Sequence, residues 1–167
     1  MAEIGIATMD DACAVSDLLH RSILYGCVKD HRNDPAILAK WLGNKKPEIV
    51  GSWFAWPSHF PLVARIDNEI VGVAMLARPG KIALLHVDPG RRGAGIGSAL
   101  LNILEQRAEK FGATRLRLAS TFSAQGFYER KGYRATGTTS VPYGVAVAMV
   151  KILPAGRHAA SSPCGCR

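Results

Sequence analysis

The eight residues Arg91 to Ser98, RRGAGIGS, lie between an apolar run that stops at Asp88 and a strongly helical segment. Three glycines alternate in this stretch, at positions 93, 95 and 97. Because glycine has no Cβ, the backbone there can turn tightly and approach a ligand closely. The first turn of the following helix adds unpaired N–H donors and a partial positive charge, which favour an anionic oxygen. The stretch therefore predicts a phosphate-binding loop between a strand and a helix.

Two other glycine loops that bind phosphate do not match this stretch. A P-loop requires Lys and then Ser or Thr directly after its last glycine, whereas Ile96 and Gly97 follow Gly95 here. A dinucleotide-binding loop requires the spacing GxGxxG and an acidic residue about 20 positions later. The spacing here is GxGxG, and the next strand-like segment carries Arg115 and Arg117. The sequence therefore disfavours ATP and dinucleotides as ligands.

The segment from Arg92 to Gly97 resembles the Q/R-x-x-G-x-G/A signature of the GCN5-related N-acetyltransferase (GNAT) family, which holds the pyrophosphate of acetyl-CoA in this way. A second segment, Ala124 to Tyr133 (AQGFYERKGY), is similar to the family's A-x-x-F/L-Y-E-K/R-x-G-F/Y motif. The two motifs have the family's order and spacing. The resemblance covers roughly residues 3 to 152.

The resemblance implies an acetyl-CoA site and a catalytic acid. The backbone at Leu85, His86 and Val87 would pair with the pantetheine arm and the acetyl carbonyl. Thr121 stands where many relatives have Asn, which weakens any assumed side-chain contact to that arm. Tyr128 aligns with the tyrosine that commonly donates a proton to the leaving thiolate. The residues whose N–H groups would hold the pyrophosphate are Arg92, Gly93, Ala94, Gly95, Ile96, Gly97 and Ser98.

The proton acceptor for the amine is not evident from the residues. The inward candidates on the strand before the loop, Ala83 and Leu85, cannot take a proton. Strand alternation places His86 on the opposite face, so we expect a core or surface histidine there rather than a base. A water relay and deprotonation of the amine before binding are the alternatives.

Apolar periodicity outside the loop predicts an α/β fold. The resemblance refines this to the GNAT fold, a mixed and mostly antiparallel sheet of about six to seven strands with flanking helices and a parallel, splayed central pair. The expected helices start near residues 12, 35, 96 and 123, and we expect residues 45–61 to form an ordered loop or short edge element. The expected strands cover 3–9, 62–66, 70–77, 81–87, 115–119, 133–138 and 143–152.

The formal charge of +8 is unevenly distributed along the chain. Residues 1–77 carry −2, residues 78–134 carry +7 and the remainder carries +3. The positive segment contains the glycine loop, and CoA presents a pyrophosphate and a 3′-phosphate, so the charge fits a CoA ligand. No aromatic and basic stripe typical of single-strand binders is present, and we expect no nucleic-acid partner. The negative N-terminal part favours a cationic amine as acceptor.

The length of 167 residues and a hydrophobic content of 48% fit one globular domain. We expect a GNAT domain over 1–153 and a flexible tail over 154–167, since the tail is small and polar. The chain contains neither an apolar run long enough for a membrane span nor a signal-peptide pattern, so a cytoplasmic location without membrane contact is expected. The four cysteines are expected as thiols and no metal site is expected. These cysteines are Cys13, Cys27, Cys164 and Cys166.

Together these features predict an acetyl-CoA-dependent N-acetyltransferase in which the amine of a small molecule attacks the thioester directly. Two alternatives stay open, a protein or peptide N-acetyltransferase and a non-catalytic acyl-CoA-binding module. The segments that would shape the acceptor pocket include His31, Glu48 and His59, but nothing in the sequence orients them. The acceptor itself and the oligomeric state, including a homodimer, are left undecided.

Overall fold

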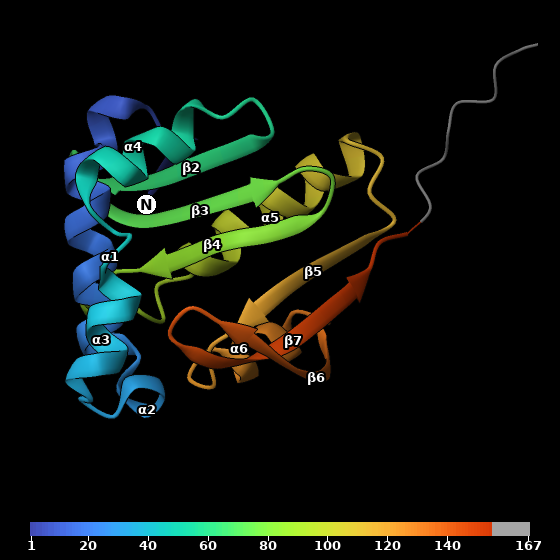
Figure 1. Cartoon of the computed structure of the whole chain (residues 1–167). Coiled ribbons are helices and arrows are strands. Elements are labelled where there is room, and N and C mark those ends of the chain that lie inside the picture. The colour runs from blue at the N-terminus through green and yellow to red at the C-terminus, as the bar shows by residue number, and fades with distance from the viewer. Residues whose placement is uncertain (155–167) are drawn as a thin grey trace, which may run out of the picture.

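The computed structural model describes residues 1–154 and places seven strands in one sheet with helices on both faces (Figure 1). The strands are β1 (Glu3–Ile6), β2 (His59–Ile66), β3 (Glu69–Ala77), β4 (Lys81–Val87), β5 (Arg115–Ser120), β6 (Arg134–Val141) and β7 (Gly144–Ile152). Their order across the sheet is β1-β2-β3-β4-β5-β7-β6. Every neighbouring pair is antiparallel except β4 and β5, which are parallel. This confirms the predicted mixed sheet with one parallel central pair.

The helices of residues 1–154 are α1 (Ala12–Gly26), α2 (Val28–His31), α3 (Pro35–Leu42), α4 (Pro47–Ala55), α5 (Ile96–Lys110) and α6 (Gln125–Arg130). Two short 3-10 turns, Met9–Asp11 and Pro89–Arg91, precede α1 and the glycine loop. The Asp34 side chain caps α3 by accepting hydrogen bonds from Ala36 N (2.8 Å) and Ile37 N (3.3 Å), as expected for Asp before a proline-initiated helix. None of these helices combines the length and apolar character needed to cross a bilayer.

The core has two layers because the central strand β3 is buried on both faces. Ala74 and Leu76 face α5 and join the cluster around Leu100. Val73 and Met75 point the other way, toward a second cluster built mainly by α1 and α4. Alternate side chains of a strand point to opposite faces, so one strand supports both layers.

The segment from residue 45 to 61, expected to lack a helix, contains α4. Pro47 starts the helix at a position where the backbone needs no N–H donor. Further along the helix, Gly51 is buried, and a Cβ added to it would stand 3.4 Å from the Ala12 side chain. Gly51 therefore lies at the point where α4 packs on α1. Packing between the two helices outweighs the low helix propensity of Gly51, which is why local sequence misled the prediction.

The parallel strands β4 and β5 pair only at one end, at Lys81 and Arg117, where Arg117 N donates to Gly80 O at 2.9 Å. Beyond that point the two strands separate, as the resemblance implied, and Figure 1 shows the widening gap between them. The sheet therefore opens in its middle. The expected tail over 154–167 lies outside the described residues except for Pro154.

Candidate functional site

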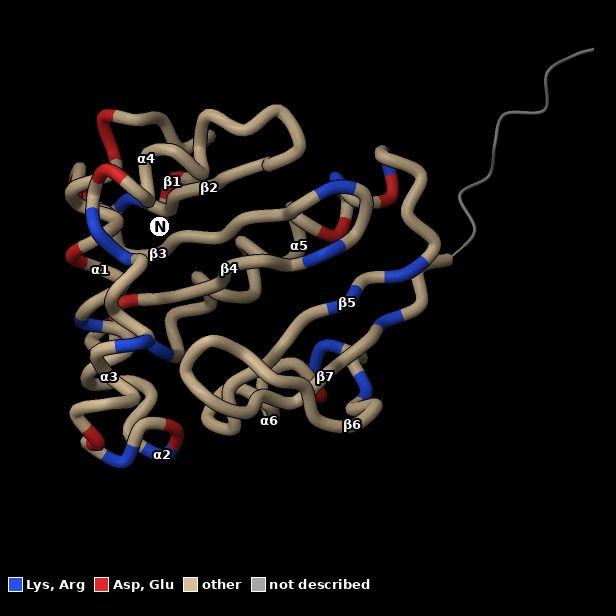
Figure 2. The backbone as a smooth tube through the Cα atoms, in the orientation of Figure 1, with Lys and Arg blue, Asp and Glu red and all other residues tan. Residues whose placement is uncertain are grey.

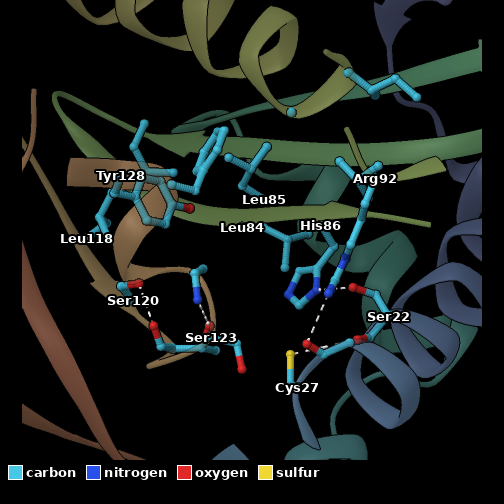
Figure 3. A pocket seen from close by; sticks show the side chains of 18 of the residues that line it. Ser22, Cys27, Leu84, Leu85, His86, Arg92, Leu118, Ser120, Ser123 and Tyr128 are labelled. Atoms are coloured by element: carbon cyan, nitrogen blue, oxygen red, sulfur yellow. Dashed lines mark hydrogen bonds between the residues drawn. The ribbon is translucent and has the colours of Figure 1, made fainter. Parts of the chain in front are cut away.

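A cavity of about 640 Å³ occupies the opening between β4 and β5 (Figure 3). Its walls come from the glycine loop, β4, β5 and α6, and from α1, α3 and the connection between α3 and α4. Of the twelve residues predicted for the site from the sequence, all but Ala94 line this cavity. The structure thus brings the two sequence motifs together, although they are about thirty residues apart along the chain.

The glycine loop has the backbone geometry of an anion site. Asp88 Oδ1 accepts a hydrogen bond from Gly90 N at 2.9 Å, which fixes the turn that leads into the loop. Gly93 (φ 82°) and Gly95 (φ 79°) adopt left-handed conformations that other residues rarely take. Gly95 is the N-cap of α5, and no side chain caps this helix. The first N–H groups of α5 are therefore free to bind an anion, and the helix dipole favours negative charge there.

The Arg92 side chain points away from the loop, toward the C-terminal end of α1. Its Nη1 donates a hydrogen bond to Gly26 O at 3.2 Å, where a cation is favoured by the helix dipole. A Cβ at position 26 would overlap the Arg92 guanidinium, so a larger residue there would displace this flexible side chain from Gly26 O. Arg92 therefore ties the glycine loop to α1, and its backbone is the part left to face a phosphate.

Strand β4 offers unpaired backbone groups along the opening. Leu85, His86 and Val87 are in register with β3 on one side of the strand. On the other side β5 pairs only with Lys81, so the backbone groups of β4 that face β5 beyond this residue have no strand partner. A β-bulge adds to the irregularity, because Met75 pairs with Leu84 whereas the next residue, Leu76, pairs with Ile82 and leaves Ala83 between them.

Tyr128 is buried in α6 with its hydroxyl at the cavity (Figure 3). Its ring packs edge-on against Phe127 and Tyr133, at centroid distances of 5.1 and 5.5 Å. Burial, with a smaller contribution from Tyr143, raises the pKa of the phenol, so the group stays protonated at neutral pH. On the neighbouring wall, Thr121 Oγ1 accepts a hydrogen bond from Ala124 N at 3.1 Å and so fixes the start of α6.

The expectation that His86 faces away from the site is wrong. Its ring lies in the cavity, where Nδ1 and Ser22 Oγ share a hydrogen bond of 2.9 Å (Figure 3). The reason is the separation of β4 from β5, which exposes the strand edge so that side chains from both faces border the gap. Burial lowers the pKa of His86 to about 4, with further lowering by the charges of Lys45 and Arg92. The imidazole is therefore neutral at neutral pH.

The wall of the cavity opposite the glycine loop and α6 is formed by residues that the sequence did not single out for the site, namely Ser22, Cys27, Trp41, Lys45 and Tyr143. The rings of Trp41 and Tyr143 stack with 3.8 Å between centroids and join α3 to the turn between β6 and β7. Burial raises the pKa of the Cys27 thiol to about 12, so the group is a neutral wall element. These residues are scattered from α1 to β7, and only the fold brings them together.

The three residues named for the acceptor segments do not line the cavity. His31 is fully buried, with Nε2 3.0 Å from Ile23 O, and His59 Nδ1 lies 2.9 Å from Trp53 O. Glu48 is exposed on α4. Both histidines therefore have structural roles in the acceptor half of the fold.

Metal chemistry has no candidate centre in the part of the chain that the structure describes, because no three His, Cys, Asp or Glu side chains are grouped to hold an ion. Cys13 and Cys27 are free within residues 1–154, whereas Cys164 and Cys166 lie outside the described residues.

Known proteins with similar sequences are acetyltransferases. Residues 47–153 match the family model described as an acetyltransferase (GNAT) domain. The chain is 45% identical over 67 residues to blasticidin-S acetyltransferase of Streptomyces morookaense, covering 38% of this chain and 49% of that protein. It is 34% identical over 95 residues to an uncharacterised N-acetyltransferase of Mycobacterium bovis, covering 53% of this chain and 61% of that protein. The chain therefore spans about half to three-fifths of the length of these relatives.

Solved structures show the same fold at lower sequence identity. A GCN5-related N-acetyltransferase from Rhodopseudomonas palustris superposes with a TM-score of 0.82 at 23% identity, covering 92% of this chain and 96% of the other. The PaiA N-acetyltransferase of Thermoplasma acidophilum, solved in complex with coenzyme A, gives 0.78 at 17% identity, covering 92% and 99%. The family model spans well over half of the residues, and the fold and glycine loop agree with it. The chain belongs to the GNAT family of acetyltransferases.

Proposed function

We propose that the protein is an acetyl-CoA-dependent N-acetyltransferase that acts on the amine of a small molecule. One observation carries the proposal. A single cavity joins the uncapped N-terminus of α5 and the unpaired edge of β4 to the Tyr128 hydroxyl and the His86 ring. These are the groups that acetyl transfer requires: anion donors, a backbone edge for the donor arm, a proton donor and a proton acceptor.

The donor end fits an acyl-CoA. The N–H groups at the start of α5 suit the pyrophosphate, and Arg91, Arg130 and Lys131 add positive charge along the same cavity. The free edge of β4 suits the amide groups of the pantetheine arm, because a strand edge pairs readily with another extended chain. Fixing the thioester in the opening would convert a bimolecular reaction into a positioned one.

In the proposed reaction the amine lone pair attacks the thioester carbon and forms the new C–N bond, while the C–S bond breaks and its electrons leave on sulfur. Tyr128 donates its proton to the thiolate, and its raised pKa ensures that this proton is present at neutral pH. The amine nitrogen becomes strongly acidic once it has attacked. His86 then accepts the proton that the nitrogen loses, because its imidazole is neutral and too weakly basic to be protonated beforehand.

Two contacts across the cavity favour a small acceptor over a protein chain. The Trp41–Tyr143 stack joins α3 to the β6–β7 turn. Asp30 of α2 accepts hydrogen bonds from Phe122 N (2.6 Å) and Ser123 Oγ (2.5 Å) in the connection between β5 and α6. Both contacts join the acceptor half of the chain to its C-terminal half. They bridge the two halves of the chain beside the cavity, whereas an extended peptide needs a groove that stays open along its length.

A panel of small amines, assayed for release of free CoA from acetyl-CoA, tests the proposal. We expect Tyr128→Phe to lower kcat about 100-fold, since general acid catalysis contributes at least that much, while the Kd for acetyl-CoA is unchanged. Tyr133→Phe is the matched control, because Tyr133 is a neighbouring buried tyrosine outside the cavity wall.

Acetyl-CoA binding without CoA release in the presence of any amine would identify the protein as a binding module instead. Acetylation of peptides, with no small amine accepted, would favour the protein acetyltransferase.

A further inference from the structure

Lys45 is a buried cation that has no carboxylate partner in residues 1–154. The residue is only 8% exposed, yet none of the salt bridges in the described residues includes it. Its Nζ donates one hydrogen bond, to Asn44 Oδ1 at 2.5 Å, and lies 5.5 Å from the centre of the Trp53 ring. An ammonium group has three donors, and the described residues provide a hydrogen-bond acceptor for one of them. Burial without a counter-charge is unfavourable for Lys, so an anion bound beside Lys45 in the cavity would stabilise it.

The position of Lys45 is fixed by the surrounding backbone. Ser16 Oγ of α1 donates a buried hydrogen bond to Lys45 O at 2.5 Å, and Lys45 N donates to Leu42 O at 2.9 Å. The short connection between α3 and α4 is therefore anchored at the point where the side chain enters the cavity wall. Burial lowers the pKa of Lys45 to about 8, so the group is still mainly protonated at neutral pH.

The cavity as a whole is cationic. Among the described residues, five Lys or Arg side chains line it and no Asp or Glu does. These five are Lys45, Arg91, Arg92, Arg130 and Lys131. Asp30, whose charge reaches Cys27 and Tyr143 in the wall, has both carboxylate oxygens engaged by the Phe122 and Ser123 donors. The negative charge of the N-terminal part therefore lies outside the lining of the cavity, and the expectation of a cationic acceptor stays a prediction without a carboxylate in the wall to support it.

Lys45 differs from the other four cations in its place in the fold. Arg91, Arg130 and Lys131 come from the glycine loop and from the end of α6, where the phosphates of the donor are expected, and the Arg92 guanidinium is held at Gly26 O. Lys45 comes from the α3–α4 connection, on the acceptor side with Ser22 and Trp41. Figure 1 shows α1, α3 and α4 together on the left, apart from α6.

We propose that Lys45 binds a carboxylate of the acceptor, so that the substrate is a small amine that also carries a carboxylate, such as an amino acid. This inference rests on the proposed acetyltransferase function. The half-buried ring of Tyr143, stacked on the buried Trp41, provides an apolar surface for the body of such a molecule. The carboxylate would take up the two free N–H donors of Lys45 and supply its missing counter-charge.

The test compares amino acids with their carboxamides, which keep the amine and the side chain but lack the charge. We expect kcat/KM for the best amino acid to exceed that of its amide by about 10–100-fold, the effect of a charge-assisted hydrogen bond. Lys45→Met and Lys45→Gln should abolish this preference by raising KM for the acid, with kcat nearly unchanged. Lys46→Met is the matched control, because Lys46 is the exposed neighbour.

Thermal unfolding separates recognition from a structural role. Lys45→Met should raise the Tm, because it removes an unpaired buried charge. A lower Tm with the acid preference intact would overturn the inference. An equal fall in kcat for acids and amides would assign Lys45 to proton transfer instead, and a weaker Kd for acetyl-CoA would assign it to the donor.

The inference and the proposed function fail in different ways. Acetylation of amides or plain amines with no preference for acids would keep the acetyltransferase and overturn the carboxylate site. Amino acids that stabilise the protein only when Lys45 is present, with no CoA released, would keep the site and overturn the acetyltransferase. If no amino acid either binds or reacts, the inference is wrong.

Discussion

The His86 ring shares a hydrogen bond with Ser22 Oγ in a cavity that also contains the charges of Lys45 and Arg92. A protonated imidazole would therefore be a third cation in a partly buried space. Burial contributes most to lowering its pKa, and the two neighbouring cations contribute the rest. The same environment that keeps His86 ready to accept a proton also makes the folded state sensitive to acid.

We expect the stability of the protein to fall as the pH drops from about 6.5 to 4. The pKa of His86 is about 4 in the folded protein and near 6.5 in the unfolded chain. The unfolded state therefore binds more protons in this window, and the free energy of unfolding decreases there by at most about 3 kcal/mol. Denaturant unfolding of the wild type and His86→Gln at several pH values measures the effect.

The difference in free energy of unfolding between the wild type and His86→Gln isolates the contribution of His86. The lowered pKa values of Asp11 and Asp88 affect both proteins alike and act at lower pH. His20→Gln, which alters a histidine at the surface of α1, should behave like the wild type. A parallel loss of stability in wild type and His86→Gln between pH 6.5 and 4 would contradict the assignment.

At the scale of single elements, the strand–loop–helix unit from β4 to α5 forms the proposed donor site. Gly95 is left-handed and Gly97 is not, so the two glycines are needed for different reasons. Gly95 provides a backbone conformation that starts α5, whereas Gly97 leaves the surface of the first turn open to a ligand. A Cβ at Gly97 would make only ordinary contacts with Phe127 and Val87, both at 3.6 Å.

Alanine at these two glycines should separate folding from binding. Gly95→Ala forces a side chain into a left-handed conformation and should lower the free energy of unfolding by about 1–2 kcal/mol. Gly97→Ala should raise it by about 0.5–1 kcal/mol, because alanine is the better helix residue. Both should weaken acetyl-CoA binding at least tenfold by calorimetry. Full acetyl-CoA affinity in Gly97→Ala would place the pyrophosphate away from the first turn of α5.

The strand–loop–helix unit could be predicted from the sequence because the patterns that specify it lie within short stretches of the chain. The glycine spacing, the helix period after it and the tyrosine of the second motif lie within short segments, and these predicted the residues of the glycine loop and of α6 that line the cavity. Trp41, Lys45 and Tyr143 carry no such signal, since they come from a helix, a connection and a turn that meet only in the folded chain. Helix α4 was missed for the same reason, because its packing on α1 at Gly51 is a tertiary contact.

At the scale of the whole molecule, the wall of the cavity is cationic, although charges of both signs are spread over the chain. Figure 2 shows Lys and Arg distributed over both halves of the chain, with Asp and Glu mostly at the periphery. The wall residues of the cavity include five cations and, within residues 1–154, no acidic side chain. The sheet is also least connected here, because β4 and β5 pair only at Lys81 and Arg117.

Acetyl-CoA should therefore stabilise the whole fold in a salt-dependent way. At a ligand concentration of 100 times Kd, the gain in free energy of unfolding is about 2.7 kcal/mol, which corresponds to a rise in Tm of roughly 5–10 °C for a protein of this size. Pantetheine, which lacks the phosphates, should give a much smaller rise. Raising the salt concentration should weaken acetyl-CoA more than pantetheine, because salt screens the phosphate contacts. Equal stabilisation by both ligands would argue against the phosphate site.

The contact between Arg92 and Gly26 constrains how this protein could be redesigned or could diverge. Under the proposed function, the acceptor side lies largely in the N-terminal helices, so exchanging α1 to α3 with those of a relative is a route to new acceptors. The guanidinium of Arg92 occupies the space that a side chain at position 26 would take. A transplanted α1 with a larger residue at this position would therefore displace Arg92 from Gly26 O and break the link between α1 and the glycine loop.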